Sequence, residues 1–206
     1  MKKVQKALLV LLRAGLWESR IEDLSCFPMS AGEWKNLYLL SRQQTVTGIV
    51  FQGIQHLPEH FLPAEELLVR WMAETDAIER KNMQMNKALE LLVQWFTESG
   101  VQPVLQKGQG IASLYENPLL RECGDIDFYF DSRQMFEKAF SLIRQCGLRG
   151  KVQADQSVTY AWKGVEVEHH TCLLDLHNPF LQRYAKELVH IPADTRSAFP
   201  VISVQS

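Results

Sequence analysis

Residues 121–130 read RECGDIDFYF, and this stretch decides the fold that we expect. The apolar and aromatic run 126–130 has the length of a buried strand. Because alternate side chains of a strand share a face, Asp125 and Asp127 are expected to point to the same side. Two neighbouring carboxylates repel each other, and burial worsens the repulsion unless a cation lies between them. Oxygen ligands at this spacing suit Mg²⁺ or Mn²⁺, although a solvated strand end or a calcium loop gives the same pattern.

A glycine turn lies upstream of this strand. Residues 101–106 form a short apolar run that predicts a strand, and Lys107-Gly108-Gln109-Gly110 then interrupts it. Some ten helical residues fit between the turn and Asp125, so the turn and the aspartates are expected at the same end of neighbouring strands. Backbone N–H groups of such a turn can bind phosphate oxygens, although most glycine turns only reverse the chain.

Two basic residues lie close to these features in the sequence. Lys107 and Arg121 would supply positive charge near a bound triphosphate. For Arg121, a solvated loop position or an ion pair with Glu122 remains an equal alternative.

A β-hairpin is predicted further along the chain. Residues 157–162 and 165–171 read as extended and flank Lys163-Gly164, a two-residue connection typical of antiparallel hairpins. Either Glu166 or Glu168, which alternate with valines, can be the third carboxylate of a two-metal site, and we favour Glu168. The same alternation is also typical of a strand with one solvated face.

The histidines near this hairpin raise the alternative of a zinc site. His169, His170, Cys172 and His177 lie close together in the sequence, with Asp175 nearby. Their spacing is not that of a known paired-ligand zinc site, and two consecutive histidines in a strand must point to opposite faces. The favoured interpretation places His170 on the face of Glu168, where it orients phosphate or an acceptor, and His177 in a surface loop.

The first hundred residues read as helices. Residues 4–16 predict a helix with Gly15 as its C-cap, and Ser30 is expected to cap a second helix that starts near Ala31. A long helix is predicted over residues 64–99, and its apolar stripe is a packing surface through which the chain could also self-associate. The sequence thus predicts a helical region over residues 1–99 and a second domain over 100–206. That domain is expected to include a short helix at 181–189 and a tail at 199–206.

Composition restricts the possible partners and compartments. The 206 residues are 46% hydrophobic and 22% charged, with net charge −2, which is ordinary for a globular protein and makes a nucleic-acid partner unlikely. The four cysteines form no CxxC motif and no signal peptide is recognisable, which predicts reduced thiols in the cytoplasm. The apolar run 7–12 is far shorter than a membrane span, so no membrane partner is expected.

These features together carry a family resemblance. Residues 105–130, LQKGQGIASLYENPLLRECGDIDFYF, resemble the core motif of the polymerase-beta-like nucleotidyltransferase superfamily, and more narrowly a bacterial family of uncharacterised nucleotidyltransferases. The segment GVEVEHH, residues 164–170, is similar to a later strand of that family, so the resemblance covers about residues 100–178. The residues that match in order are Lys107, Gly108, Tyr115, Arg121, Gly124, Asp125, Asp127, Glu168 and His170.

The chain departs from the superfamily pattern at two positions. Gln109 follows Gly108 where the usual turn has glycine or serine, and the third acid is commonly aspartate rather than glutamate. Family members also often continue into further helices, so we interpret this chain as a short form or a fragment.

The resemblance implies an α/β (α+β) fold, in which helices flank a mixed sheet and a helical N-terminal region precedes it. It implies binding of a nucleoside triphosphate such as ATP with two Mg²⁺ (or Mn²⁺) ions, and transfer of the nucleoside monophosphate to an acceptor hydroxyl or phosphate. The acceptor is an unidentified small molecule or protein. By motif, the catalytic and metal-binding residues are Asp125, Asp127 and Glu168, which is also a possible base. The nucleotide-binding residues would be Lys107, Gly108, Gln109, Gly110, Arg121, Gly124 and His170.

Two other classes of function remain as alternatives. One is a catalytically silent nucleotide-binding or regulatory module, and the presence of all three acids argues against it because unneutralised carboxylates are costly to hold together. The other is a helical interaction protein that uses its long helix as an arm and is indifferent to Mg²⁺.

Overall fold

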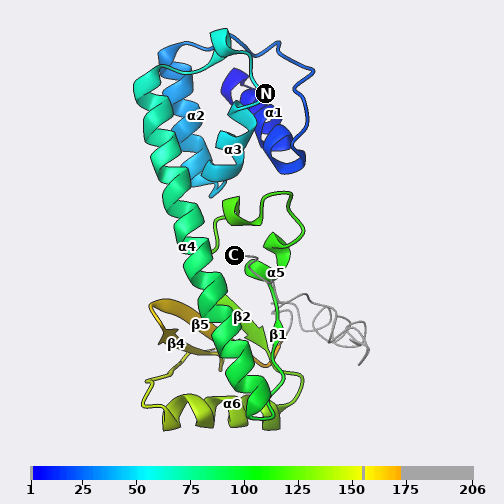
Figure 1. The fold of residues 1–206 in the computed structure, drawn as a ribbon, viewed down its shortest axis with the longest axis vertical. Helices are drawn as coiled ribbons and strands as arrows, with labels where there is room; N and C mark the ends of the chain where they lie inside the picture. Colours follow the sequence, from blue (N-terminus) through cyan, green and yellow to red (C-terminus); the bar gives the residue numbers. More distant parts are fainter. Residues whose placement is uncertain (1, 155, 173–206) are drawn as a thin grey trace. The chain divides into compact units, whose positions relative to one another are not determined.

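The computed structural model describes residues 2–154 and 156–172 (Figure 1). The expected helix at 181–189, the tail at 199–206, Asp175 and His177 lie outside the described residues. The α-helices are α1 (Lys3–Trp17), α2 (Ala31–Gln43), α3 (Thr47–Ile54), α4 (Glu65–Glu98), α5 (Gln109–Ala112) and α6 (Arg133–Gln145). The strands are β1 (Val104–Leu105), β2 (Ile126–Tyr129), β3 (Lys151–Val152), β4 (Val158–Trp162) and β5 (Val165–His170). Two 3₁₀ turns cover Glu59–Phe61 and Pro118–Leu120.

The chain forms two compact units. Among the described residues, the first consists of residues 2–84 and 111–123, and the second of residues 85–110, 124–154 and 156–172. The chain passes from one unit to the other within α4, within α5 and immediately before Gly124. The predicted division between residues 99 and 100 stays a prediction.

The first unit is helical, and two glycines allow α1 and α3 to pack closely. A Cβ on Gly15 would lie 1.9 Å from the carbonyl oxygen of Ile49, and one on Gly53 would lie 2.0 Å from that of Leu11. Gly15 is therefore required by backbone contact between helices. The expectation that Gly15 is a C-cap was wrong, because α1 continues to Trp17 and Glu18 adopts the left-handed capping conformation.

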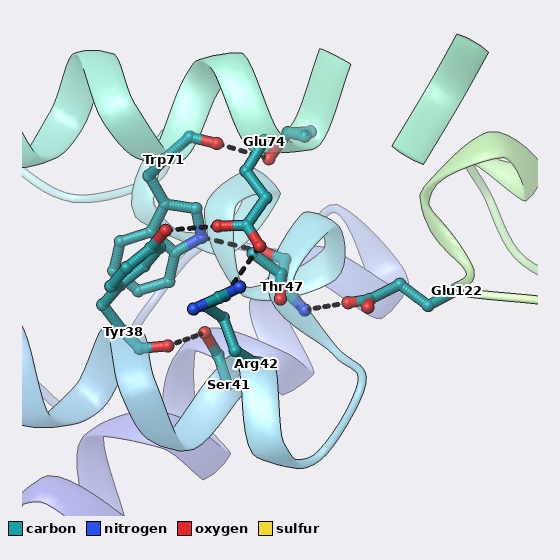
Figure 2. Close-up of polar contacts among 8 residues, drawn as sticks. Tyr38, Ser41, Arg42, Thr47, Trp71, Glu74 and Glu122 are labelled. Carbon is teal, nitrogen blue, oxygen red and sulfur yellow. Dashed lines mark hydrogen bonds and ion pairs between the residues drawn. The ribbon is translucent and has the colours of Figure 1, made fainter. Parts of the chain in front are cut away.

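Polar contacts join α2, α3 and α4 around a buried tryptophan (Figure 2). Trp71 of α4 donates its indole N–H to the carbonyl oxygen of Thr47 at 3.0 Å. Tyr38 of α2 donates its hydroxyl to Glu74, and Arg42 pairs with the same carboxylate at 2.7 Å. Ser30 caps α2 as predicted, through a capping box that includes Glu33 at the third helical position.

The second unit contains a mixed five-stranded sheet in the order β1-β2-β5-β4-β3. The β2–β5 pair is parallel, and the other three pairs are antiparallel. The predicted hairpin between β4 and β5 is confirmed. Its connecting residues Lys163 and Gly164 both have positive φ (50° and 80°), as a type I′ turn requires.

One face of this sheet carries the aromatic core of the unit. Phe128 of β2 and His169 of β5 contact the ring of Phe96 from α4, and Phe136 of α6 contacts His169. Helices α4 and α6 therefore pack on this face. By strand alternation, Asp127 and Glu168 lie on the opposite face.

The fold class is the predicted one, because a helical N-terminal region precedes a mixed α+β sheet. The long helix predicted over 64–99 is confirmed as α4. None of the helices among the described residues combines the length and hydrophobicity that a bilayer crossing requires.

Candidate active site

The parallel ladder between β2 and β5 brings two acids together. Asp127 is the register partner of Glu168, and both side chains project to the face of the sheet opposite the aromatic core. His170, two residues further along β5, projects to the same face. One ligand atom from each of Asp127, Glu168 and His170 lies within 4.8 Å of the other two. This group, which we call the acidic cluster, is the candidate site.

Asp127 lies at the centre of the cluster and is 0% exposed. Its Oδ1 contacts two possible donors, Lys107 Nζ at 3.1 Å and His170 Nε2 at 3.1 Å. Its other oxygen, Oδ2, is buried and accepts no hydrogen bond from the residues that the structure describes. A buried carboxylate oxygen normally has a partner, so Oδ2 is a position at which a cation is expected.

The contacts between Asp127, Lys107 and His170 shift the pKa of Asp127 and that of His170. Burial alone would raise the pKa of Asp127, but the hydrogen bond from His170 and the ammonium group of Lys107 outweigh burial and lower it. In return, the hydrogen bond to Asp127 raises the pKa of His170, against the opposing effect of burial. The carboxylate of Asp127 is thus held in its charged form.

Asp125 is half-buried, immediately before β2, and is not one of the three residues of the acidic cluster. Burial and the negative charge of Asp127 raise its pKa, and Lys107 offsets part of this effect. The two aspartates of the motif are therefore unequal. Asp127 is fully buried and contacts Lys107 and His170, whereas the pKa of Asp125 is raised by burial and by the charge of Asp127. An additional positive charge beside them would favour ionisation of both.

Glu168 is oriented by a residue from the neighbouring strand segment. Ser157 Oγ donates to Glu168 Oε1 at 2.6 Å, and Glu168 Oε2 lies 3.5 Å from His170 Nε2. Glu166 is exposed and lies outside the acidic cluster. The geometry accordingly favours Glu168 over Glu166 as the third acid.

The glycine turn lies directly beside β2. The backbone N–H of Gln106 donates to the carbonyl oxygen of Asp127 at 2.9 Å, and that of Gly110 donates to Lys107 at 3.2 Å. Gly108 has φ +60°, and a Cβ there would lie 3.2 Å from the carbonyl oxygen of Asp125. Glycine is suited to this position because the left-handed conformation and the close backbone both disfavour a side chain.

Gln109 points into the protein. It is 2% exposed, and its Nε2 donates to Asn86 Oδ1 of α4 at 2.8 Å. A nucleotide contact by Gln109 would therefore have to come from its backbone.

The helix at the glycine turn is α5, with four residues instead of about ten, so that part of the expectation was wrong. A separate 3₁₀ turn, with Asn117 as its N-cap, starts only at Pro118.

The remaining predicted nucleotide-binding residues are Arg121 and Gly124. Arg121 belongs to the first unit, where its guanidinium donates to Cys123 Sγ at 2.9 Å and its carbonyl oxygen accepts a hydrogen bond from Asn82. Gly124 has no atom within 4 Å of a Cβ built on it. Their role in nucleotide binding stays a prediction.

The two consecutive histidines point to opposite faces of β5, as expected. His169 is buried in the aromatic core. Its Nε2 lies 2.8 Å from the hydroxyl oxygen of Tyr160. Burial lowers the pKa of His169 to about 3, so its ring is neutral. A single zinc ion cannot use both histidines of this strand.

The comparison with protein families agrees with the geometry of the acidic cluster. Residues 30–203 match a family described as uncharacterised nucleotidyltransferases. The chain belongs to that family. No curated protein and no solved structure gives a significant match.

Membership of the nucleotidyltransferase family supports nucleotidyl transfer as the general activity. Nucleotidyltransferases typically use divalent metal ions, and the donors of the acidic cluster are compatible with one. The nucleotidyltransferase resemblance seen in the sequence is thereby confirmed.

Two residues were not predicted from the sequence: Ser157, which contacts Glu168 of the acidic cluster, and Asn86, which contacts Gln109 of the glycine turn. Ser157 begins the predicted hairpin, and its side-chain contact with Glu168, whose register partner is Thr159, could not be foreseen without the register of the strands. Asn86 is a buried polar residue on the apolar face of the long helix, beside Met85. A polar residue in an apolar stripe is a signal that could have identified it.

Proposed function

We propose that this nucleotidyltransferase transfers a nucleoside monophosphate from a nucleoside triphosphate to an acceptor hydroxyl or phosphate, with two Mg²⁺ or Mn²⁺ ions. The observation that carries this proposal is the pairing of Asp127 with Glu168 across β2 and β5, with Asp127 Oδ2 buried and without a donor among the described residues. A carboxylate oxygen in this setting is the kind of ligand that a hard divalent cation takes.

Asp125, Asp127 and Glu168 would hold the metal ions. Bound ions would lower the pKa of the acceptor hydroxyl and offset the negative charge that develops on the phosphate oxygens. Burial and the charge of Asp127 raise the pKa of Asp125, and the added positive charge would favour its ionised form.

Lys107 would contact the triphosphate. Its side chain is 53% exposed and its ammonium group lies 3.1 Å from Asp127 Oδ1, so this group would be able to reach a phosphate oxygen of a bound nucleotide. Gly108 places no side chain between the turn and the nucleotide. Lys107 thus neutralises the carboxylate in the free protein and the phosphate in the complex.

Glu168 is the candidate general base. Its Oε2 would take the proton of the acceptor hydroxyl while the acceptor oxygen forms a bond to the α-phosphorus. The bond between the α-phosphorus and the bridging oxygen breaks, and pyrophosphate leaves with that electron pair. Ser157 orients Glu168 through its other carboxylate oxygen. The acceptor is an unidentified small molecule or protein.

Calorimetric titration of the four ribonucleoside triphosphates, with and without Mg²⁺, tests the proposal without knowledge of the acceptor. Wild type is compared with Asp127→Asn and with Glu166→Gln, which removes an exposed acid from the same sheet. We expect Mg²⁺-dependent binding in wild type and Glu166→Gln and its loss in Asp127→Asn. Absence of Mg²⁺-dependent binding in wild type would contradict the proposal and favour a helical interaction protein.

A further inference from the structure

The turn that carries Lys107 is fixed to β2 by its own backbone. The backbone N–H of Gln106 donates to the carbonyl oxygen of Asp127, and Gly108 approaches the carbonyl oxygen of Asp125. Both contacts lie on the strand side of the turn. The short helix α5, only four residues long, offers little packing of its own to hold the other side.

A buried amide pair holds that other side. Gln109 Nε2 donates to Asn86 Oδ1 at 2.8 Å, and the two residues are 2% and 8% exposed. A buried amide group is costly when it loses its hydrogen bond, so this bond favours one arrangement of the backbone around Gln109. The pair joins the residue two positions after Lys107 to the long helix α4.

We propose that Asn86 and Gln109 are positioning residues, which fix residues 106–109 between β2 and α4 and so direct Lys107 Nζ to the triphosphate. This inference rests on the proposed function. It also gives a role to Gln109, which stands where the usual superfamily turn has glycine or serine. The Gln109 side chain points inward and contacts α4. Lys107 has a flexible side chain, and the position of its ammonium group is only as well defined as the backbone that carries it.

The first test is amide hydrogen exchange of the full chain without metal or nucleotide. In Asn86→Ala the amide of Gln106 is expected to exchange about tenfold faster than in wild type, because loss of one buried hydrogen bond loosens the turn. The matched control is Gln94→Ala, which removes an exposed amide from the same helix. Unchanged exchange at Gln106 in a folded Asn86→Ala variant would overturn the inference.

The second test separates positioning of Lys107 from general damage. In Asn86→Ala, the affinity for a Mg²⁺-nucleoside triphosphate is expected to fall about tenfold, while Mn²⁺ affinity without nucleotide stays within about twofold of wild type. A parallel fall in both affinities would show that the variant disturbs the acidic cluster itself and would contradict the inference.

An exchange of the two side chains provides the rescue. Asn86→Gln and Gln109→Asn each alter the span of the pair, whereas the double variant restores the combined length and both amides. We expect each single variant to lose triphosphate affinity and the double variant to recover most of it. If the double variant binds the triphosphate no more tightly than either single variant, the positioning role of the pair is refuted. This test does not require that Asn86→Ala folds. If wild type binds no triphosphate, the proposed function fails, and Gln106 exchange still decides whether the pair fixes the turn.

Discussion

Asp127 and Glu168 are register partners in the parallel β2–β5 ladder, although 40 residues separate them in the sequence. The pairing places the fully buried carboxylate of Asp127 beside the partly buried carboxylate of Glu168 on the same face of the sheet. The buried acid is held charged by Lys107 and His170, and the other is held by Ser157. Asp127 and Glu168 are therefore held by different residues, and the two sets of contacts can be tested separately.

The two glutamates of β5 should differ in metal binding. Glu168→Gln is expected to lower Mn²⁺ affinity at least about tenfold, because it removes one charged ligand from the acidic cluster. Glu166→Gln should change it less than about twofold, since this side chain is exposed and outside the cluster. Calorimetric titration with Mn²⁺ measures both. The reverse order of effects would make Glu166 the third acid.

Ser157→Ala should weaken metal binding without removing a ligand. The lost hydrogen bond to Glu168 Oε1 leaves the carboxylate free to rotate, and partners of this kind typically contribute tenfold or more to metal affinity. Mn²⁺ titration of Ser157→Ala against Ser141→Ala, an exposed serine on α6, measures the effect. Equal affinities in the two variants would exclude an orienting role for Ser157.

His169 should make the fold sensitive to acid. Its pKa is lowered to about 3 by burial, so between pH 6.5 and 3 the unfolded chain binds a proton that the folded chain does not. Stability is therefore fully present above pH 6.5 and falls as the pH drops, by up to about 1.4 kcal/mol per pH unit from this residue. Urea unfolding at several pH values measures the slope.

The variant His169→Phe isolates that contribution. It should unfold with a shallower pH dependence over this range than wild type, even if it is less stable at neutral pH through the lost partner of Tyr160. His60→Gln, at an exposed position, serves as the control and should keep the wild-type slope. An unchanged slope in His169→Phe would mean that other groups cause the acid sensitivity.

Two glycine substitutions in the first unit should have opposite signs. Gly53→Ala places a Cβ 2.0 Å from the carbonyl oxygen of Leu11, and we expect a loss of about 2 kcal/mol or more because α1 and α3 must separate. Gly32→Ala in α2 meets no atom within 4 Å and should stabilise by about 0.5–1 kcal/mol through helix propensity. Thermal unfolding followed by circular dichroism compares them. A neutral Gly53→Ala would show that the helices are not in such close contact.

The elements with a clear period or turn signal could be predicted from the sequence. The capped helix α2, the long helix α4 and the hairpin at Lys163-Gly164 each carry a local signal, and all three are present. Helix α3 carries no such signal. Every residue of α3 except Gln52 is buried, so it lacks the polar face that reveals an amphipathic helix.

The site was predictable in its residue types and less so in its contacts. The aspartates and Glu168 stand out in the sequence because acids beside buried strands are costly. No local sequence pattern predicts that Gln109 points inward to Asn86 or that Ser157 donates to Glu168. Both contacts depend on which elements pack together.

The strand order also bears on how the chain is synthesised and folded. Among the described strands, β5 is last in the sequence, yet it lies in the middle of the sheet between β2 and β4. Until β5 leaves the ribosome, β2 lacks its parallel neighbour. The edges of β2 and β4 that β5 will later pair with are then exposed. Metal binding by the acidic cluster would therefore report completion of the sheet, since Asp127 meets Glu168 only when this last strand is inserted.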